Sequence, residues 1–215
     1  EYNILNDFIS EACRFIQNVS DEDTLSWMEI AQHFGTPTRL LDFTENPLVA
    51  LYFACCEAKQ EDACVWIIDK VGYFKELHYI KTAVLEMESR ARIQDILYTQ
   101  IIARDANVMS NDCGDYPWIY KPHYREERMN TQASIFMLWG YDRRALTAML
   151  EPDNYIKDKD VDNKGCGFIG CIDIPAKYKG IILKQLAICG ISEKYIYPGI
   201  DGAGKYVKEK YSYHG

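Results

Sequence analysis

The run from Gln32 to Thr44 (QHFGTPTRLLDFT) constrains the fold of this chain more than any other segment. Gly35 is placed to end a helix in a left-handed cap, and Thr38–Asp42 (TRLLD) reads as a short strand. Thr44 is placed to cap a further helix from about residue 45 to 59, which is apolar nearly all round and is therefore expected to be buried. This close succession of helix, turn, strand and helix predicts a mixed α and β structure.

Two amphipathic helices are expected before this run. The first spans residues 3–19, where apolar side chains recur at helical spacing. Ser20 is placed to cap the second, and the acidic residues 21–23 complement the positive end of its dipole. The apolar stripe of the first helix consists of Leu5, Phe8, Ile9, Ala12 and Ile16, and that of the second of Leu25, Met28, Ala31 and Phe34.

The remaining elements follow from apolar runs and turn residues. Pro175 is placed to start a helix that ends near Gly190, and a last helix is expected after Asp201. Strands are predicted at residues 63–69, 117–124, 132–139, 167–174 and 195–197, a partly helical stretch at 86–104, and loops at 107–116 and 153–164. Together these elements predict the α+β class, as a single mixed domain over 1–215 with helices around a small central sheet.

Composition narrows the class of protein. The 215 residues include 24 Lys and Arg against 32 Asp and Glu, a formal net charge of −8, and this excludes a general nucleic-acid binder, which needs a net basic face. There is no run of 18 apolar residues, so no membrane span is expected. The first residues, Glu1 to Ile4, contain neither a signal-peptide pattern nor a Met, and we expect the chain to begin inside a longer protein.

The eight cysteines predict free thiols. Most stand among apolar residues, no C-x-x-C pair occurs, and Cys166 and Cys171 have no matching Cys/His pair nearby. We therefore expect no metal site and a reducing, cytoplasmic compartment.

The junction between strand and helix is the strongest candidate site. Asp42 and Thr44 share one face of the expected strand and lie where it meets a helix N-terminus, which favours a phosphate or another anion. Arg39 lies on the opposite face, where a guanidinium needs a carboxylate or a ligand phosphate. A purely structural interpretation stays open: Thr44 is a helix cap, Asp42 pairs with Arg39 or caps a turn, and His33 is a satisfied helix-end histidine.

Other candidate sites carry weaker patterns. Gly199–Gly204 (GIDGAG) lacks the features of a phosphate-binding loop and is expected to be a turn before a helix. Cys113 and His123 could form a thiol–imidazole pair, although nothing in the sequence orients them. The aromatic run Tyr116, Trp118, Tyr120 and Tyr124 fits a ligand-stacking surface or, more simply, one packed face of a strand.

The run from Gln32 to Thr44 and the segment Pro47–Ala54 (PLVALYFA) closely resemble the FRG-domain family. Its pattern, QH-aromatic-G-x-PTRLLD-aromatic-T-x-x-P-x-VAL-aromatic-FA, is matched at nearly every position. Later patches also resemble the family, so that the resemblance spans about residues 4–207; they are Arg128-x-x-x-Gln132-x-x-x-Phe136, Leu186, Gly190-Ile191, Ile196–Pro198 and Asp201-Gly202. The family's Phe/Tyr-Arg-Gly motif is absent from this chain, and we expect it to precede Glu1.

The chain also resembles, more weakly, the ADP-ribosyltransferases. In those enzymes a Ser-Thr-Ser-like strand leads into a helix and a Glu or Gln strand follows; Asp42–Thr44 and Gln132 stand at these places here. The resemblance implies an ADP-ribosyltransferase-like fold, NAD as a substrate and catalytic roles for Asp42 and Gln132. We expect no metal, and we expect ligand contacts from His33, Thr38, Arg39, Thr44 and Arg128. The transferases stabilise a cationic ribose with a Glu, whereas Gln132 is neutral.

Three functions remain open on the sequence. The first is an NAD-using ADP-ribosyltransferase-like enzyme acting as a toxin or phage-defence effector, in keeping with a family found mainly in bacteria and phages. The second is a non-catalytic module that binds a nucleotide or another anion through Arg39, Asp42 and His33. The third is an interaction domain without a small-molecule site. The sequence identifies no protein or nucleotide acceptor.

Overall fold

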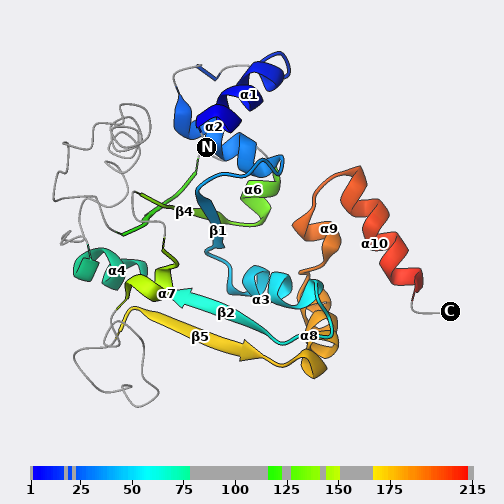
Figure 1. Ribbon diagram of the computed structural model, residues 1–215. Helices are drawn as coiled ribbons and strands as arrows, with labels where there is room; N and C mark the ends of the chain where they lie inside the picture. The colour runs from blue at the N-terminus through cyan, green and yellow to red at the C-terminus, as the bar shows by residue number, and fades with distance from the viewer. Residues whose placement is uncertain are drawn as a thin grey trace. The chain divides into compact units, whose positions relative to one another are not determined.

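The computed structural model describes residues 2–16, 19–20, 23–77, 116–122, 127–140, 144–150 and 167–212. The chain forms two compact units. Unit 1 consists of Glu1–Asp42, Asp69–His123 and Phe136–Phe168, and unit 2 of Phe43–Ile68, Tyr124–Ile135 and Ile169–Gly215. The described part contains helices, one three-stranded sheet and one two-stranded sheet, which confirms the predicted α+β class (Figure 1).

Unit 1 begins with two helices, α1 (Tyr2–Ala12) and α2 (Thr24–His33), which pack against each other. α1 is shorter than the expected helix over 3–19. The amide of Phe15 donates to the carbonyl of Ala12 in a tight turn, which closes the helix and leaves the Phe15 side chain exposed.

The N-cap of α2 differs from the predicted one, whereas the predicted glycine at its C-terminal end is confirmed. The N-cap is Asp23 rather than Ser20, and the Asp23 carboxylate accepts from the amide of Ser26 at 3.1 Å. Gly35 follows the helix with φ of +79°, as predicted. Phe34 is 61% exposed, because it lies beyond the last helical turn and so outside the buried stripe. The buried stripe includes Leu25, Met28 and Ala31.

Strand β1 (Leu40–Thr44) starts two residues later than predicted. The Thr38 hydroxyl accepts a hydrogen bond from the amide of Leu40 at 3.1 Å, which folds residues 38–40 into a turn. The chain passes from unit 1 to unit 2 after Asp42, within this strand.

Strand β1 belongs to a small sheet with β3 (Trp118–Tyr120) and β4 (Ser134–Leu138); β3 lies in unit 1, and β4 runs from the end of one segment of unit 2 into unit 1. Unit 1 also contains the helices α4 (Lys70–Leu77) and α7 (Leu146–Met149). The strand order is β1-β4-β3, and β3 pairs antiparallel with β4. Both β3 and β4 fall inside the stretches 117–124 and 132–139 that the sequence predicted as strands.

Aromatic side chains fill the interior of unit 1. Tyr73 and Phe74 of α4 are both almost fully buried; Tyr73 packs edge-on against Phe168, and Phe74 against Trp118. The Tyr73 hydroxyl donates to the carbonyl of Pro117 at 2.7 Å, so the one polar atom of this ring is satisfied inside the core.

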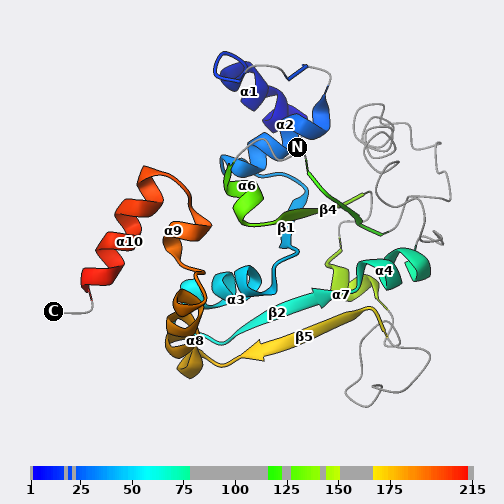
Figure 2. The ribbon, with the colours of Figure 1, turned by 180° about the vertical axis from the view of Figure 1, so that it is seen from behind.

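Unit 2 combines a two-stranded sheet with helices (Figure 2). Its elements are α3 (Pro47–Cys56), β2 (Ala63–Ile68), α6 (Glu127–Thr131), β5 (Ile169–Ile174), α8 (Ala176–Ile188), α9 (Glu193–Ile196) and α10 (Ile200–Ser212). α3 packs against α8 and β2, while α9 contacts both α6 and α10.

Helix α3 is capped by Asn46 rather than by Thr44, because the Asn46 side chain accepts from the amide of Leu48 at 3.0 Å. The expectation that this helix is buried nearly all round is wrong. It buries one face, and Leu48 and Phe53 on its other side are each 39% exposed. The buried residues of α3 are Val49, Tyr52 and Cys55.

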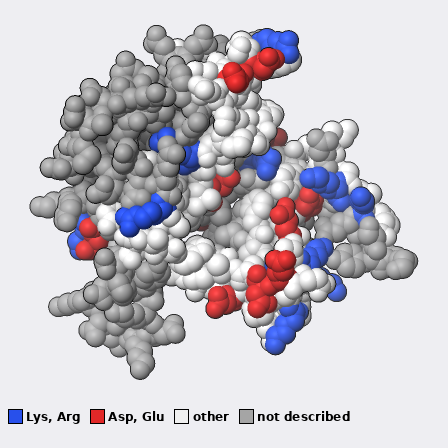
Figure 3. All heavy atoms as spheres, in the orientation of Figure 1, with Lys and Arg blue, Asp and Glu red and all other residues white. Residues whose placement is uncertain are grey.

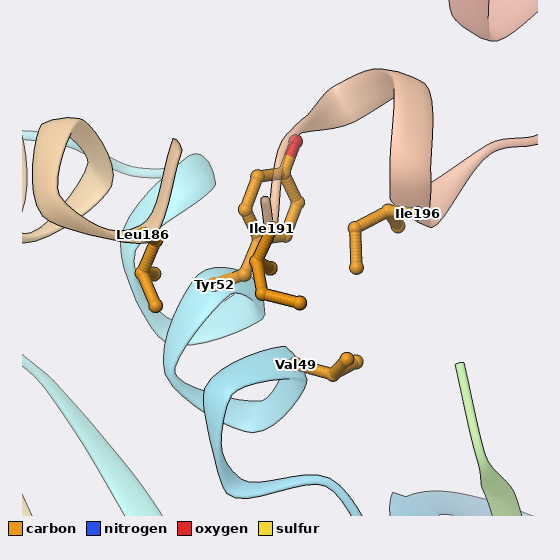
Figure 4. Close-up of a cluster of buried hydrophobic side chains, with 5 residues drawn as sticks. All are labelled: Val49, Tyr52, Leu186, Ile191 and Ile196. Atoms are coloured by element: carbon orange, nitrogen blue, oxygen red, sulfur yellow. The ribbon is translucent and has the colours of Figure 1, made fainter. Parts of the chain in front are cut away.

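An apolar cluster joins α3 to the C-terminal helices of unit 2 (Figure 4). Its members are Val49, Tyr52, Leu186, Ile191 and Ile196. The Tyr52 hydroxyl points away from the aliphatic side chains, toward the α9 segment. This cluster fixes the α9 segment against α3, since hydrophobic burial is the main favourable term in such packing.

Strands β2 and β5 pair antiparallel from Ala63 opposite Ile174 to Ile68 opposite Ile169. Both predicted strands are confirmed, with slightly narrower bounds. The strand over 63–69 is not buried as expected, because a two-stranded ribbon leaves much of its surface open; Trp66 and Ile67 are among its exposed residues.

The C-terminal helices follow the predicted turns with one exception. α8 starts after Pro175, and Gly190 ends it with φ of +87°. Residues 195–197 were expected to form a strand, but α9 occupies this place, and the amide of Tyr197 donates to the carbonyl of Glu193 at 2.9 Å. Gly199 has φ of +111° immediately before α10, so the glycine-rich GIDGAG segment is a turn and helix start, as predicted.

The described cysteines are free thiols, and no disulfide joins them; they are Cys13, Cys55, Cys56, Cys64, Cys171 and Cys189. Within the described ranges no helix is long and apolar enough to cross a membrane, and no three His, Cys, Asp or Glu side chains are grouped to hold a metal. Several predictions lie outside the described residues: Asp21, Glu22, the stretches 86–104, 107–115 and 153–164, Cys113, His123, Tyr124 and Cys166.

Candidate functional site

The residues predicted to form the site are divided between the two units. His33, Thr38, Arg39 and Asp42 belong to unit 1, whereas Thr44, Arg128 and Gln132 belong to unit 2.

In unit 1, Gln32 connects Thr38 and Asp42. Its side-chain carbonyl accepts from the Thr38 hydroxyl at 2.7 Å, and its Nε2 donates to Oδ2 of Asp42 at 3.1 Å. One amide therefore joins the end of α2 to both the turn and β1. These hydrogen bonds give Gln32, Thr38 and Asp42 a structural role in holding the motif together.

His33 and Arg39 have local contacts in unit 1. The His33 ring packs edge-on against Phe34, with ring centres 5.0 Å apart. The Arg39 guanidinium donates to the carbonyls of Trp139 and Gly140 at 3.4 and 3.3 Å. Arg39 thus braces the end of β4, and the amide of Trp139 donates back to the Arg39 carbonyl at 3.1 Å.

In unit 2, Thr44 and Gln132 are in direct contact. The Thr44 hydroxyl donates to the backbone carbonyl of Gln132 at 2.6 Å and accepts from the amide of Asn46 at 2.9 Å. The Gln132 side chain donates through Nε2 to the carbonyl of Ile196 at 3.1 Å. Gln132 therefore links the start of α3 to α9, while its Oε1 accepts no hydrogen bond from the described residues.

Arg128 lies one helical turn before Gln132, and the amide of Gln132 donates to the Arg128 carbonyl at 3.0 Å. The Arg128 guanidinium lies over the ring of Tyr197, 4.6 Å from its centre. Among the described residues this half-buried guanidinium has neither an acidic partner nor a hydrogen-bond acceptor. A cation–π contact uses the charge and leaves the N–H donors available, and these donors match phosphate and carboxylate oxygens.

A second cation lies at the same ring. Lys205 of α10 places its ammonium 4.7 Å from the centre of Tyr197 and 3.7 Å from Oε1 of Glu193. The other carboxylate oxygen of Glu193 accepts a short hydrogen bond from the Tyr52 hydroxyl. Arg128 and Lys205 therefore both lie at the Tyr197 ring, and the Glu193 carboxylate beside Lys205 is held by Tyr52.

The electrostatic environment of Tyr197 keeps its hydroxyl protonated. Burial raises the pKa of Tyr197, the charge of Arg128 lowers it, and the carboxylates of Glu193 and Glu57 raise it again. The phenol is thus a neutral, half-buried platform rather than an ionised group near neutral pH.

The sequence pointed to Arg128 and Gln132 as site residues but not to the roles of the residues around them. Glu193 lies in α9, Tyr197 directly follows that helix and Lys205 lies in α10, and none of the three belongs to a chemical motif. Gly202 was the available signal, because a Cβ there would lie only 1.7 Å from the carbonyl oxygen of Tyr197. That close approach holds the start of α10, and hence Lys205, against Tyr197.

The family model of the FRG domain matches residues 1–63. This confirms the resemblance predicted from the motif, and the match contains Gln32, Thr38 and Asp42, which the structure joins by hydrogen bonds. A search of curated proteins and of solved structures found no significant match.

The FRG match ends at residue 63, whereas Arg128, Gln132 and Tyr197 lie beyond it. The match therefore does not account for these residues of unit 2. The ADP-ribosyltransferase resemblance rests only on Asp42–Thr44 and Gln132.

On the described surface around α8–α10, basic and acidic side chains are interspersed (Figure 3). An anion at this surface would therefore be bound by a small set of residues, rather than by a continuous basic face of the kind that binds a nucleic-acid backbone.

Proposed function

We propose that this FRG-domain protein is a binding or sensing module for an anionic, phosphate-bearing nucleotide, which it holds through unit 2. The observation that carries this proposal is the Arg128 guanidinium, which is half-buried on Tyr197 without an acceptor among the described residues. Arginine donates to phosphate oxygens through two parallel N–H groups, so a phosphate satisfies these donors well.

Gln132 supports the same site. It lies one turn from Arg128, and its Oε1 has no hydrogen-bond donor among the described residues. A side-chain amide with a free acceptor is suited to a ligand hydroxyl or amino group, such as those of a ribose or a base. Thr44 holds the Gln132 backbone in place and contributes to the site through that contact.

Binding is favoured over ADP-ribosyl transfer. A transferase needs a charge that stabilises a cationic ribose, and the Gln132 amide is neutral and already donates to the Ile196 carbonyl. NAD therefore enters this proposal as one nucleotide of the ligand panel rather than as a substrate. A role as a toxin or phage-defence effector would depend on the transferase activity and would be tested with it.

Thermal-shift and calorimetric titrations with AMP, ADP, ATP and NAD test the proposal. We expect at least one nucleotide to bind the wild-type protein and to bind Arg128→Gln at least tenfold more weakly. Lys184→Gln is the matched control, since Lys184 is an exposed cation on α8 in the same unit. Equal binding by wild type and Arg128→Gln, or binding by neither, would overturn the proposal.

The transferase alternative has its own measurement. The protein is incubated with NAD and a cell lysate, and released nicotinamide and labelled ADP-ribose are measured. Nicotinamide release that disappears in Gln132→Ala would show that the chain is an enzyme, and the binding-module proposal would then be wrong.

A further inference from the structure

The ring of Tyr197 brings two cationic groups close together. Arg128 in α6 lies 4.6 Å from the ring centre, and Lys205 in α10 lies 4.7 Å from it. The guanidinium and the ammonium are therefore separated by no more than about twice that distance. Both cations can therefore attract the same anionic ligand, and a ligand with more than one negative charge would interact favourably with each of them.

Lys205 can turn toward such a ligand at small cost. Its ion pair with Glu193 is long, at 3.7 Å, and the Lys205 side chain is 62% exposed. A long ion pair with a largely exposed lysine contributes little to stability. Glu193 keeps a partner when Lys205 leaves, because its other oxygen accepts from the Tyr52 hydroxyl.

The two cations have different recognition chemistry. The Arg128 guanidinium binds one phosphoryl group through paired N–H donors, whereas the Lys205 ammonium is a point charge on a flexible stem. Two phosphoryl groups joined through a shared oxygen give each of the two cations an anionic group of its own.

The carboxylates near the ring bear on where such a ligand binds. Glu193 lies at the Lys205 side of Tyr197, and the charges of both Glu193 and Glu57 are felt at the Tyr197 hydroxyl. An anion is therefore favoured beside the two cations and away from the Glu193 carboxylate.

We propose that the ligand of unit 2 carries a diphosphate, with one phosphoryl group bound by Arg128 and the other by Lys205 beside the Tyr197 ring. This inference rests on the proposed function and adds the ligand class and a second binding residue. The position of Lys205 is built into the fold, because the approach of Gly202 to Tyr197 fixes the first turn of α10.

Calorimetric titration of the full chain with inorganic phosphate and with inorganic pyrophosphate, at one fixed ionic strength, tests this inference. Wild type is expected to bind pyrophosphate at least tenfold more tightly than phosphate. Lys205→Gln should abolish this preference while phosphate binding stays within about twofold, since Lys205 supplies only the second contact. Lys184→Gln should retain the preference, because that lysine lies on the exposed surface of α8.

The outcomes separate the two proposals. If phosphate and pyrophosphate bind equally and both depend on Arg128, the binding site stands and the diphosphate inference is wrong. A pyrophosphate preference that persists in Lys205→Gln also overturns the inference. If neither anion nor any nucleotide binds, the proposed function itself fails.

Discussion

Gln32 in α2 donates a hydrogen bond through Nε2 to Oδ2 of Asp42 in β1, with 3.1 Å between the two atoms. The same side chain accepts from the Thr38 hydroxyl. The FRG match covers all three residues, and within unit 1 their shared hydrogen bonds join a helix end to the strand that follows it.

Gln32→Glu is expected to destabilise the protein by about 1 kcal/mol at pH 7, because it replaces the donor that faces Asp42 with a second carboxylate. The contact with Thr38 is retained, since a carboxylate still accepts from the hydroxyl. Urea-induced unfolding measures the change.

The double variant Gln32→Glu/Asp42→Asn is the matched control. It exchanges donor and acceptor and should recover most of the lost stability. If the double variant is no more stable than Gln32→Glu, the two side chains do not interact in the way the structure indicates.

The hydroxyl of Thr44 is expected to contribute to the stability of unit 2. Thr44→Val keeps the shape of the side chain but removes the donor to the Gln132 carbonyl and the acceptor for the Asn46 amide. We expect a loss of about 1–2 kcal/mol in the free energy of unfolding.

Thr44→Ser retains the hydroxyl and should unfold close to wild type. Chemical denaturation of both variants makes the comparison. Equal losses in the Val and Ser variants would assign the effect to the methyl group rather than to the hydrogen bonds.

Two glycines of α10 are expected to respond in opposite directions to alanine. A Cβ at Gly202 would lie 1.7 Å from the Tyr197 carbonyl oxygen, which is backbone and cannot rotate away. Gly202→Ala should therefore cost about 1–3 kcal/mol or more and disturb the contact of Lys205 with Tyr197. Gly204 has no heavy atom within 4 Å of a built Cβ, so Gly204→Ala should stabilise the helix by about 0.5–1 kcal/mol.

Thermal unfolding compares the stabilities of the two variants. Nucleotide titrations show whether Gly202→Ala also weakens binding. If Gly202→Ala is as stable as Gly204→Ala, then α10 does not approach Tyr197 as closely as described.

The sequence predicted the elements well where a residue has one strong local preference. Gly35 and Gly190 end their helices with positive φ, and Pro175 precedes α8, as expected. The predicted start of β1 and the predicted N-cap of α3 were wrong, because in both places a threonine hydroxyl forms a hydrogen bond with nearby backbone. The side chains of Thr38 and Thr44 accept from amides two residues later, which delays β1 and leaves the α3 cap to Asn46.

Other predictions failed because the feature in question depends on tertiary packing rather than on local sequence. The run Tyr195–Tyr197 is apolar and aromatic, but three residues are too few to distinguish a strand from a helical turn. The apolar sequence of α3 could not show that only one face meets other elements. The sequence pointed to Arg128 as a ligand contact and to Gln132 as a catalytic residue. The contacts of Tyr197 with Arg128 and with Lys205 depend on how α9 and α10 pack, which no local pattern shows.

The buried hydroxyl of Tyr73 gives unit 1 a predicted sensitivity to alkaline pH. Burial raises the pKa of Tyr73 well above its ordinary value, and the neighbouring Tyr116 raises it further. In the unfolded chain the same phenol loses its proton near pH 10. Above about pH 10 the unfolded state therefore binds fewer protons than the folded state, and the contribution of Tyr73 to stability falls by up to about 1.4 kcal/mol per pH unit.

Tyr73→Phe separates this effect from the titration of other groups. At about pH 8 the variant should be less stable than wild type by about 1–2 kcal/mol, because the hydrogen bond from the Tyr73 hydroxyl to the Pro117 carbonyl is lost inside the core. Between about pH 9 and pH 11 its stability should fall less steeply than that of wild type, so the two curves converge. Tyr178→Phe, which removes an exposed hydroxyl, should keep the wild-type slope. Parallel curves for wild type and Tyr73→Phe would show that the phenol titrates alike in the folded and unfolded chains, contrary to its burial.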